Sequence, residues 1–126
     1  MSSLIFEKQK LDEFMEQTRA KLAELIGYNE ATFELKNNEL IVDFKDSSRN
    51  KDYYFVYTLN KHSITQYRLE CVTYVKIGNT SAAKIRQTWL LISASLNFDS
   101  LSDRLEAELQ NMLDVINENY DYEEED

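Results

Sequence analysis

The spacing of apolar residues changes twice along this chain, and the two changes limit its fold class. Residues 4–26 repeat apolar side chains at steps of three and four, as an amphipathic helix does. Residues 31–77 change to the period of strands, with apolar side chains alternating in the runs at 33–44 and 66–77 and strong β formers on both faces of 53–59. Helical spacing then returns after residue 82. A helix, a run of strands and further helices predict the α+β class.

The first segment has the spacing of a short coiled coil. The seam positions, at steps of 4, 3, 4 and 3, are Leu11, Met15, Thr18, Leu22 and Leu25, and its apolar members Leu11, Met15, Leu22 and Leu25 are the candidate dimer contacts. Steps of four and three are typical of such a seam, whereas a helix packed on its own core carries a broader apolar stripe. Two hypotheses stay open: the helix dimerises through this seam, or it packs on the chain's own sheet. Gly27 supplies a residue that can end the helix in the left-handed conformation.

Four strands are expected between residues 31 and 77. Two alternating runs surround Asn37-Asn38, and asparagine tolerates the positive φ of a tight hairpin turn. A polar loop at 45–52 precedes a strand at 53–59, and a short turn leads to a strand at 66–77. Consecutive strands with short links predict an antiparallel meander.

Two helices are expected after the sheet, packed together on one of its faces. Thr80 or Ser81 can cap a helix over residues 82–95, and Asp99 or Ser100 can cap a last one. The apolar positions of these two helices are Ile85, Trp89 and Ile92, then Leu101, Leu105, Leu109, Met112 and Ile116. The other face of the sheet is expected to be wet or to meet a partner.

Charge is unevenly distributed along the chain. The 23 acids and 14 bases give a net charge of −9, which argues against binding to phosphate backbones or to acidic membranes. Residues 45–86 carry eight bases and three acids, a net of +5, whereas residues 87–126 carry eleven acids and one base, a net of −10. The predicted organisation is therefore a helix at 1–27, an α+β head at 28–117 and an acidic tail at 118–126.

The tail is expected to be disordered, because a run of like charges repels itself and has no apolar period. A second hypothesis makes it a docking strip for a basic partner. Its candidate contact residues are then Tyr120, Tyr122, Glu123, Glu124 and Glu125.

The sequence offers few residues that could carry out catalysis. His62, the only histidine, falls in a polar turn, and Cys71, the only cysteine, alternates into an apolar strand face where we expect it to be buried. The isolated glycines form no phosphate loop. We therefore predict a protein that is not an enzyme and has no catalytic, cofactor or metal site.

Cysteine count and hydropathy bear on the compartment. A single cysteine excludes an internal disulfide framework and fits an intracellular, reducing compartment. No apolar run approaches the roughly 20 residues that span a bilayer. Nucleic-acid binding by the basic middle is disfavoured by the acidic flanks. The residues with suitable chemistry for it are Arg68, Lys76, Lys84, Arg86, Tyr67 and Tyr74.

Four segments together resemble the RWD-type globular heads of kinetochore and chromosome-segregation proteins. They are 22–27 (LAELIG), 38–44 (NELIVDF), 53–59 (YYFVYTL) and 96–105 (LNFDSLSDRL). The pattern is similar to the head of a small subunit of the outer-kinetochore microtubule-binding complex, and also to the monopolin head. The resemblance implies a nuclear, non-catalytic module that pairs through its helix and presents its head to other subunits.

Our leading prediction is thus a protein-interaction module, a homodimer or heterodimer paired through the first helix, with a head that docks a partner. Two alternatives remain open. One is a small acidic inhibitor whose carboxylates imitate the phosphates of a nucleic acid. The other is a secretion-type chaperone, which is also small, acidic and α+β.

Overall fold

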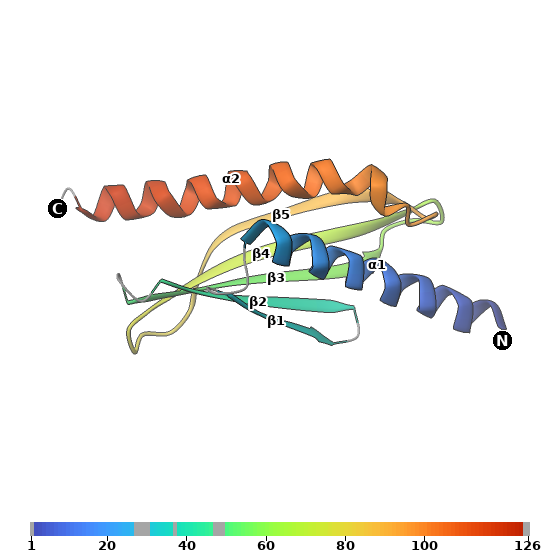
Figure 1. The fold of residues 1–126 in the computed structure, drawn as a ribbon, viewed down its shortest axis with the longest axis horizontal. Helices are drawn as coiled ribbons and strands as arrows, with labels where there is room; N and C mark the ends of the chain where they lie inside the picture. Colours follow the sequence, from blue (N-terminus) through green and yellow to red (C-terminus); the bar gives the residue numbers. More distant parts are fainter. Residues whose placement is uncertain (1, 27–30, 37, 47–49, 125–126) are drawn as a thin grey trace.

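The fold consists of one antiparallel sheet covered on one face by two helices (Figure 1). The computed structural model describes residues 2–26, 31–36, 38–46 and 50–124, with side chains for 8–26, 31–36, 38–46 and 50–114. Its elements are α1 (Ser2–Ile26), β1 (Ala31–Lys36), β2 (Glu39–Asp46), β3 (Lys51–Lys61), β4 (Gln66–Ile77), β5 (Ala83–Ser93) and α2 (Phe98–Glu124). The strands lie in the order β1-β2-β3-β4-β5, so the predicted α+β class and antiparallel meander are confirmed.

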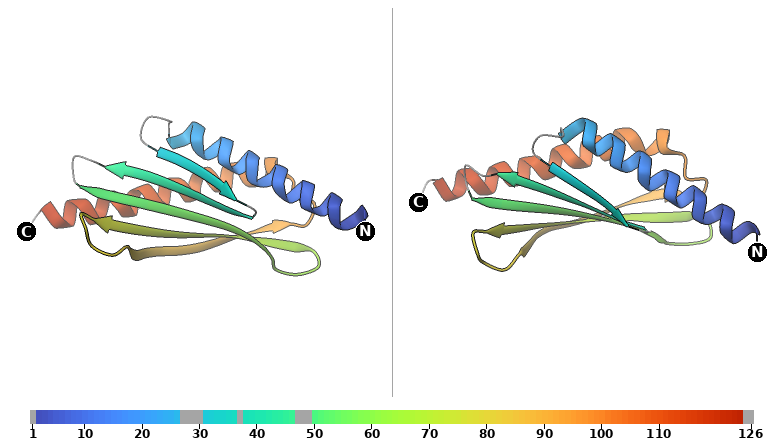
Figure 2. Two further views of the ribbon diagram at one scale, coloured as in Figure 1. Left: turned by 90° about the horizontal axis from the view of Figure 1, so that it is seen from below. Right: turned by 60° about the horizontal axis from the view of Figure 1, so that its bottom comes forward.

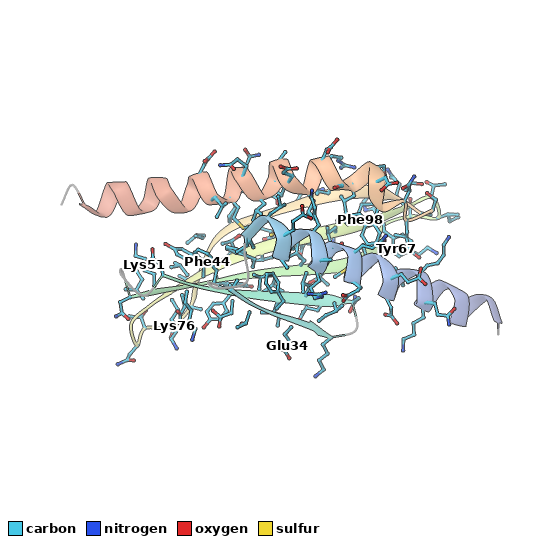
Figure 3. The ribbon with its side chains drawn as sticks, in the orientation of Figure 1. Glu34, Phe44, Lys51, Tyr67, Lys76 and Phe98 are labelled. Carbon is cyan, nitrogen blue, oxygen red and sulfur yellow. The ribbon has the colours of Figure 1, made fainter. Side chains whose placement is uncertain are left out.

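Alternation along the strands separates a helix side from an open side of the sheet. Tyr53, Phe55 and Tyr57 of β3 are buried, while the residues between them are half-buried. Both helices lie on the side of the buried set, as the two views of Figure 2 show. In Figure 3, Phe44 and Phe98 lie on that side, and Glu34 and Lys76 point away from it.

The core lies between the sheet and the two helices. Phe14 of α1 meets Phe98 of α2 edge to face, with ring centroids 5.8 Å apart. Thr18 is fully buried and donates a hydrogen bond to the Phe14 carbonyl at 2.9 Å, which satisfies its hydroxyl within the helix. The helix side chains buried in this core are Phe14, Met15, Leu22, Ala23, Leu101, Leu105, Leu109 and Met112.

The prediction of four strands and a helix over 82–95 is wrong, because residues 83–93 form the fifth strand, β5. Thr88, Leu90 and Ile92 alternate toward the helices, opposite Cys71, Leu69 and Tyr67 of β4. Three spaced apolar residues satisfy a helical stripe and a strand equally well over so short a stretch. β-branched and aromatic residues are common in this segment, and such residues favour a strand.

The turn before β5 also differs from the prediction. Gly78 adopts a φ of +58°, and the Thr80 hydroxyl donates to the Ile77 carbonyl at 2.7 Å. Thr80 therefore closes a hairpin turn between β4 and β5 and does not cap a helix. The bond makes the reversal tight enough for β5 to return along β4.

The C-terminal helix begins and ends at residues other than those predicted. Asn97 is its cap, since the Asn97 side-chain oxygen accepts from the Asp99 amide at 3.0 Å. At the other end the backbone stays helical to Glu124, so residues 118–124 of the predicted disordered tail belong to α2. No proline or glycine occurs after Gly78 to stop the helix, and glutamate is a good helix former.

Candidate partner-binding face of the sheet

The side of the sheet that faces away from α1 and α2 is the candidate binding face, which we call the open face. Backbone pairing aligns its side chains in rows across the strands. The central row is Glu34, Ile41, Val56, Val72 and Gln87, one from each strand. Three of these five are aliphatic and half-buried, although no helix covers them. A face that met only water would carry polar side chains at such positions.

Aromatic side chains extend this apolar centre. Tyr54 of β3 pairs directly with Tyr74 of β4 in the next row. Trp89 of β5 lies opposite Glu70, one row to the other side, and 56% of its surface is exposed. Tryptophan and tyrosine are enriched in protein interfaces, since each offers a large apolar area with little rotamer entropy to lose.

Trp89 is surrounded by a small polar cluster. The Arg68 guanidinium carbon lies 6.0 Å from the centroid of the Trp89 ring, within cation–π range. Gln87 donates to the Glu70 carboxylate at 3.3 Å and accepts from the Lys84 ammonium at 3.0 Å. The indole is therefore bordered by a cation that lies within cation–π range of its ring.

The two sides of the molecule differ in charge. Helix α2 carries nine acids and one base, a net of −8, so it accounts for nearly all of the net charge of −9. On the open face, β4 and β5 carry three bases, Arg68, Lys76 and Lys84, against the single acid Glu70. The sheet thus separates an acidic helix from a locally basic strand pair.

Asp43 is the least well satisfied group of the open face. One of its carboxylate oxygens is buried and has no hydrogen-bonding partner among the described residues. Desolvation raises the pKa of this carboxyl above its ordinary value, against an opposing effect from Lys45. The side chain is held in its row of β2, opposite Tyr54 of β3.

The residues predicted to form a dimer seam pack into the core of the fold. Met15 and Leu22 have no exposed surface, and Leu11 and Leu25 are partly buried against the same core. Their apolar area faces the sheet and α2. Of the two hypotheses for this helix, the structure therefore agrees with packing on the chain's own sheet. Met15 and Leu22 have no surface left for contact with a second copy.

The other sequence candidates are divided between the two sides. Arg86 and Tyr67 point toward the helices, so they do not share a face with Arg68 and Lys76. The predicted contact residues Tyr120, Tyr122, Glu123 and Glu124 fall on the helical backbone of α2, with side chains outside the described set, and Glu125 lies outside the described residues. His62 is exposed in the turn between β3 and β4.

A buried ion pair under α2 was not predicted. Glu108 is only 9% exposed, and one of its oxygens accepts from the Arg86 guanidinium and, at 2.7 Å, from the Thr88 hydroxyl. The helical spacing does place residue 108 next to the apolar stripe at Leu105 and Leu109. That adjacency was the one signal in the sequence for its burial.

Two further polar groups lie buried near this pair. The Tyr57 hydroxyl has no oxygen or nitrogen partner among the described residues, and its neighbour is the Cys71 thiol directly across in β4. Burial raises the pKa of Cys71 to about 12 and that of Tyr57 well above its ordinary value. A thiol held protonated is a poor nucleophile, so this cluster acts as part of the core. The prediction that Cys71 is buried is confirmed.

Among the described residues, neither α1 nor α2 contains an apolar stretch of the length that a membrane span needs. Across the same residues, no group of three or more metal-ligating side chains converges. No protein-family model, curated protein or solved structure matches this chain.

Proposed function

We propose that this protein is a non-catalytic interaction module that binds a partner protein through the open face of its sheet. The observation that carries the proposal is the row of Ile41, Val56 and Val72, flanked by Tyr54 and Tyr74, on a face that neither helix covers. Apolar side chains that gather on a face open to solvent are typical of interaction sites.

The position of the helix residues supports the same assignment. Met15 and Leu22 are taken up by the core, so an association of this chain uses another surface. The open face offers apolar side chains at its centre and charged ones at its margin, for example Lys36 and Lys76, which is the arrangement of a standard interface.

The resemblance to RWD-type heads adds a cellular setting to this proposal. Its support is the succession of an N-terminal helix, an antiparallel meander and a C-terminal helix. In that setting the module is a subunit of a chromosome-segregation assembly. A tagged copy in the native cell should then co-purify with kinetochore components, and a copy that enriches none of them would contradict this setting.

Site-specific photo-crosslinking tests the binding face. A benzoylphenylalanine at Gln87 samples the open face, and one at Gln110, exposed on α2, is the matched control. We expect a discrete crosslinked product in cells from position 87 and none from position 110. The purified partner should then lose binding to Val72→Glu but not to Gln110→Glu, with both variants folded by circular dichroism. Crosslinking from Gln110 alone would refute the proposal.

A further inference from the structure

We infer that the segment bound at the β4–β5 end of the open face is an acidic peptide of another protein that carries a large apolar side chain. This inference rests on the proposed function and adds the chemical class of its ligand. The carrying observation is the pairing of an exposed indole with a cation that has no anionic partner among the side chains that the structure describes. Trp89 supplies the apolar contact, and Arg68 supplies the charge.

The apolar anchor is defined by exposure and by neighbours. Trp89 is 56% exposed, and Leu91, two residues along β5, is half-buried on the same face. Val72 of β4 lies beside Gln87 in the central row and continues this surface toward the middle of the sheet. An aliphatic or aromatic side chain laid over the indole would bury all three together. Tryptophan in such a position often carries a large share of an interface's binding energy.

Charge complementarity selects an acidic ligand. Arg68 lies over the indole, and no carboxylate of the described residues lies within ion-pair distance of Arg68, Lys76 or Lys84. The one acid of the two strands, Glu70, accepts from Gln87. An anionic side chain entering beside Trp89 would therefore meet the Arg68 guanidinium, a group that binds carboxylates through two parallel hydrogen bonds.

Two other occupants, a basic segment and a second copy of this chain, would meet charges of their own sign. A basic segment would place its cations against Arg68 and Lys84. A second copy docked face to face would bring the same three bases, Arg68, Lys76 and Lys84, against this face. The ligand's acids instead approach the side of the sheet from which α2 is absent (Figure 2).

The single tryptophan gives a direct test of the local charge without any ligand. Iodide and caesium quench an exposed indole at rates set by the local potential. With each rate normalised to the quenching of free N-acetyltryptophanamide, we expect iodide to quench Trp89 more strongly than caesium in spite of the acidic protein. Arg68→Gln should reduce the iodide preference, and Lys36→Gln, an equal charge change on β1 of the same face, should leave it unchanged. A preference for caesium in the wild type would overturn the inference.

Peptide binding tests the ligand class. The probe is an eight-residue peptide alternating glutamate with leucine, with one central phenylalanine; matched peptides replace glutamate by lysine, or leucine and phenylalanine by serine. We expect only the first to shift Trp89 emission to shorter wavelength, with affinity about tenfold weaker for Arg68→Gln, or roughly 1.4 kcal/mol, and unchanged for Lys36→Gln. Stronger binding of the lysine peptide, equal effects of the two substitutions, or no shift at millimolar probe would overturn the inference.

Failure of the inference and failure of the proposed function give different results. A partner crosslinked from Gln87 whose binding is insensitive to Arg68→Gln would refute the acidic ligand and leave the open face as a binding site. Absence of any crosslink from Gln87 would refute the binding face itself. Concentration-dependent shielding of Trp89 in the protein alone would show that the occupant is a second copy, which also overturns the inference.

Discussion

The ion pair between Glu108 and Arg86 gives a quantitative test of how α2 is held on the sheet. Glu108 is 9% exposed, and the Arg86 side chain is 18% exposed. One Glu108 oxygen accepts both from Arg86 and from the Thr88 hydroxyl of β5. Glu108→Ala therefore leaves a guanidinium and a hydroxyl under the helix without their acceptor.

The expected cost follows from these contacts. Removing one partner of a buried ion pair costs about 3–5 kcal/mol. Because water still reaches part of Arg86, we take the lower end, about 3 kcal/mol. The Thr88 hydrogen bond adds about 1 kcal/mol. The free energy of unfolding should thus fall by about 4 kcal/mol, a large part of the 5–15 kcal/mol typical of such domains.

Urea unfolding followed by far-UV circular dichroism measures this loss. With a slope of about 2 kcal/mol per molar, the midpoint should fall by about 2 M. Glu106→Ala is the control on the same helix. Its side chain is 56% exposed and lies 3.8 Å from Lys21, so its loss should cost less than about 0.5 kcal/mol.

A double variant separates pairing from packing. Arg86→Met with Glu108→Leu replaces both charges by apolar groups, an exchange that is often neutral or stabilising in buried pairs. The double variant should therefore be more stable than Glu108→Ala by about 2 kcal/mol or more. A Glu108→Ala protein within 1 kcal/mol of the wild type, or a double variant as unstable as the single one, would refute this account.

Three further predictions concern single residues. The pKa of Cys71 is about 12 in the fold, so as the pH rises above 9 its thiol ionises in the unfolded chain before it does so in the folded one. Between pH 9.5 and 10.5, urea titrations should therefore show the free energy of unfolding falling by about 1 kcal/mol more in the wild type than in Cys71→Ala. Asp43→Asn should raise the unfolding midpoint at pH 7 and have no effect near pH 3, because the raised pKa of Asp43 makes only its ionised form unfavourable in the fold. Gly78→Ala should cost about 1–2 kcal/mol in the same assay, since its φ is +58° and a Cβ would meet the Asn50 side-chain nitrogen at 3.2 Å; a neutral Gly78→Ala would contradict the turn geometry.

The meander could be predicted because period-two patterns repeat over several strands. In β4, Tyr67, Leu69 and Cys71 alternate with polar residues at 68 and 70, and the observed burial follows that alternation residue by residue. Register followed from the short hairpins, for example Lys36 opposite Glu39 across a two-residue link. Local sequence carried this information, so no tertiary knowledge was required.

Strand β5 and the packing of α1 could not be predicted, because their apolar patterns fit more than one partner. Residues 83–93 are compatible with either period, and the choice is made by backbone pairing with β4. The same holds for Met15 and Leu22, whose heptad spacing fits a second helix as well as a sheet. Where a pattern suits two partners, the partner that lies nearest in the folded chain decides, and spacing contains no such information.

The buried pair and the exposed indole show the same limit for single residues. Glu108 and Glu106 look alike in the sequence, yet one meets Arg86 under the helix and the other lies near Lys21 at the surface. Trp89 was predicted on a buried helix face and is instead the most exposed aromatic side chain of the described residues. Contacts between elements, not local pattern, assign these roles.

The separation of charge by the sheet determines how far the net charge matters for binding. A helix packed on a sheet places its outer side chains more than roughly 10 Å from the opposite face, which exceeds the Debye length of about 8 Å at physiological salt. At that salt the potential beside Trp89 is set by Arg68 and Lys84, and the net −8 of α2 is largely screened. At low salt the field of α2 extends to the open face and opposes an acidic ligand. The charge of this protein therefore acts on its ligands locally, and an affinity measured at low salt would underestimate the attraction that the open face exerts.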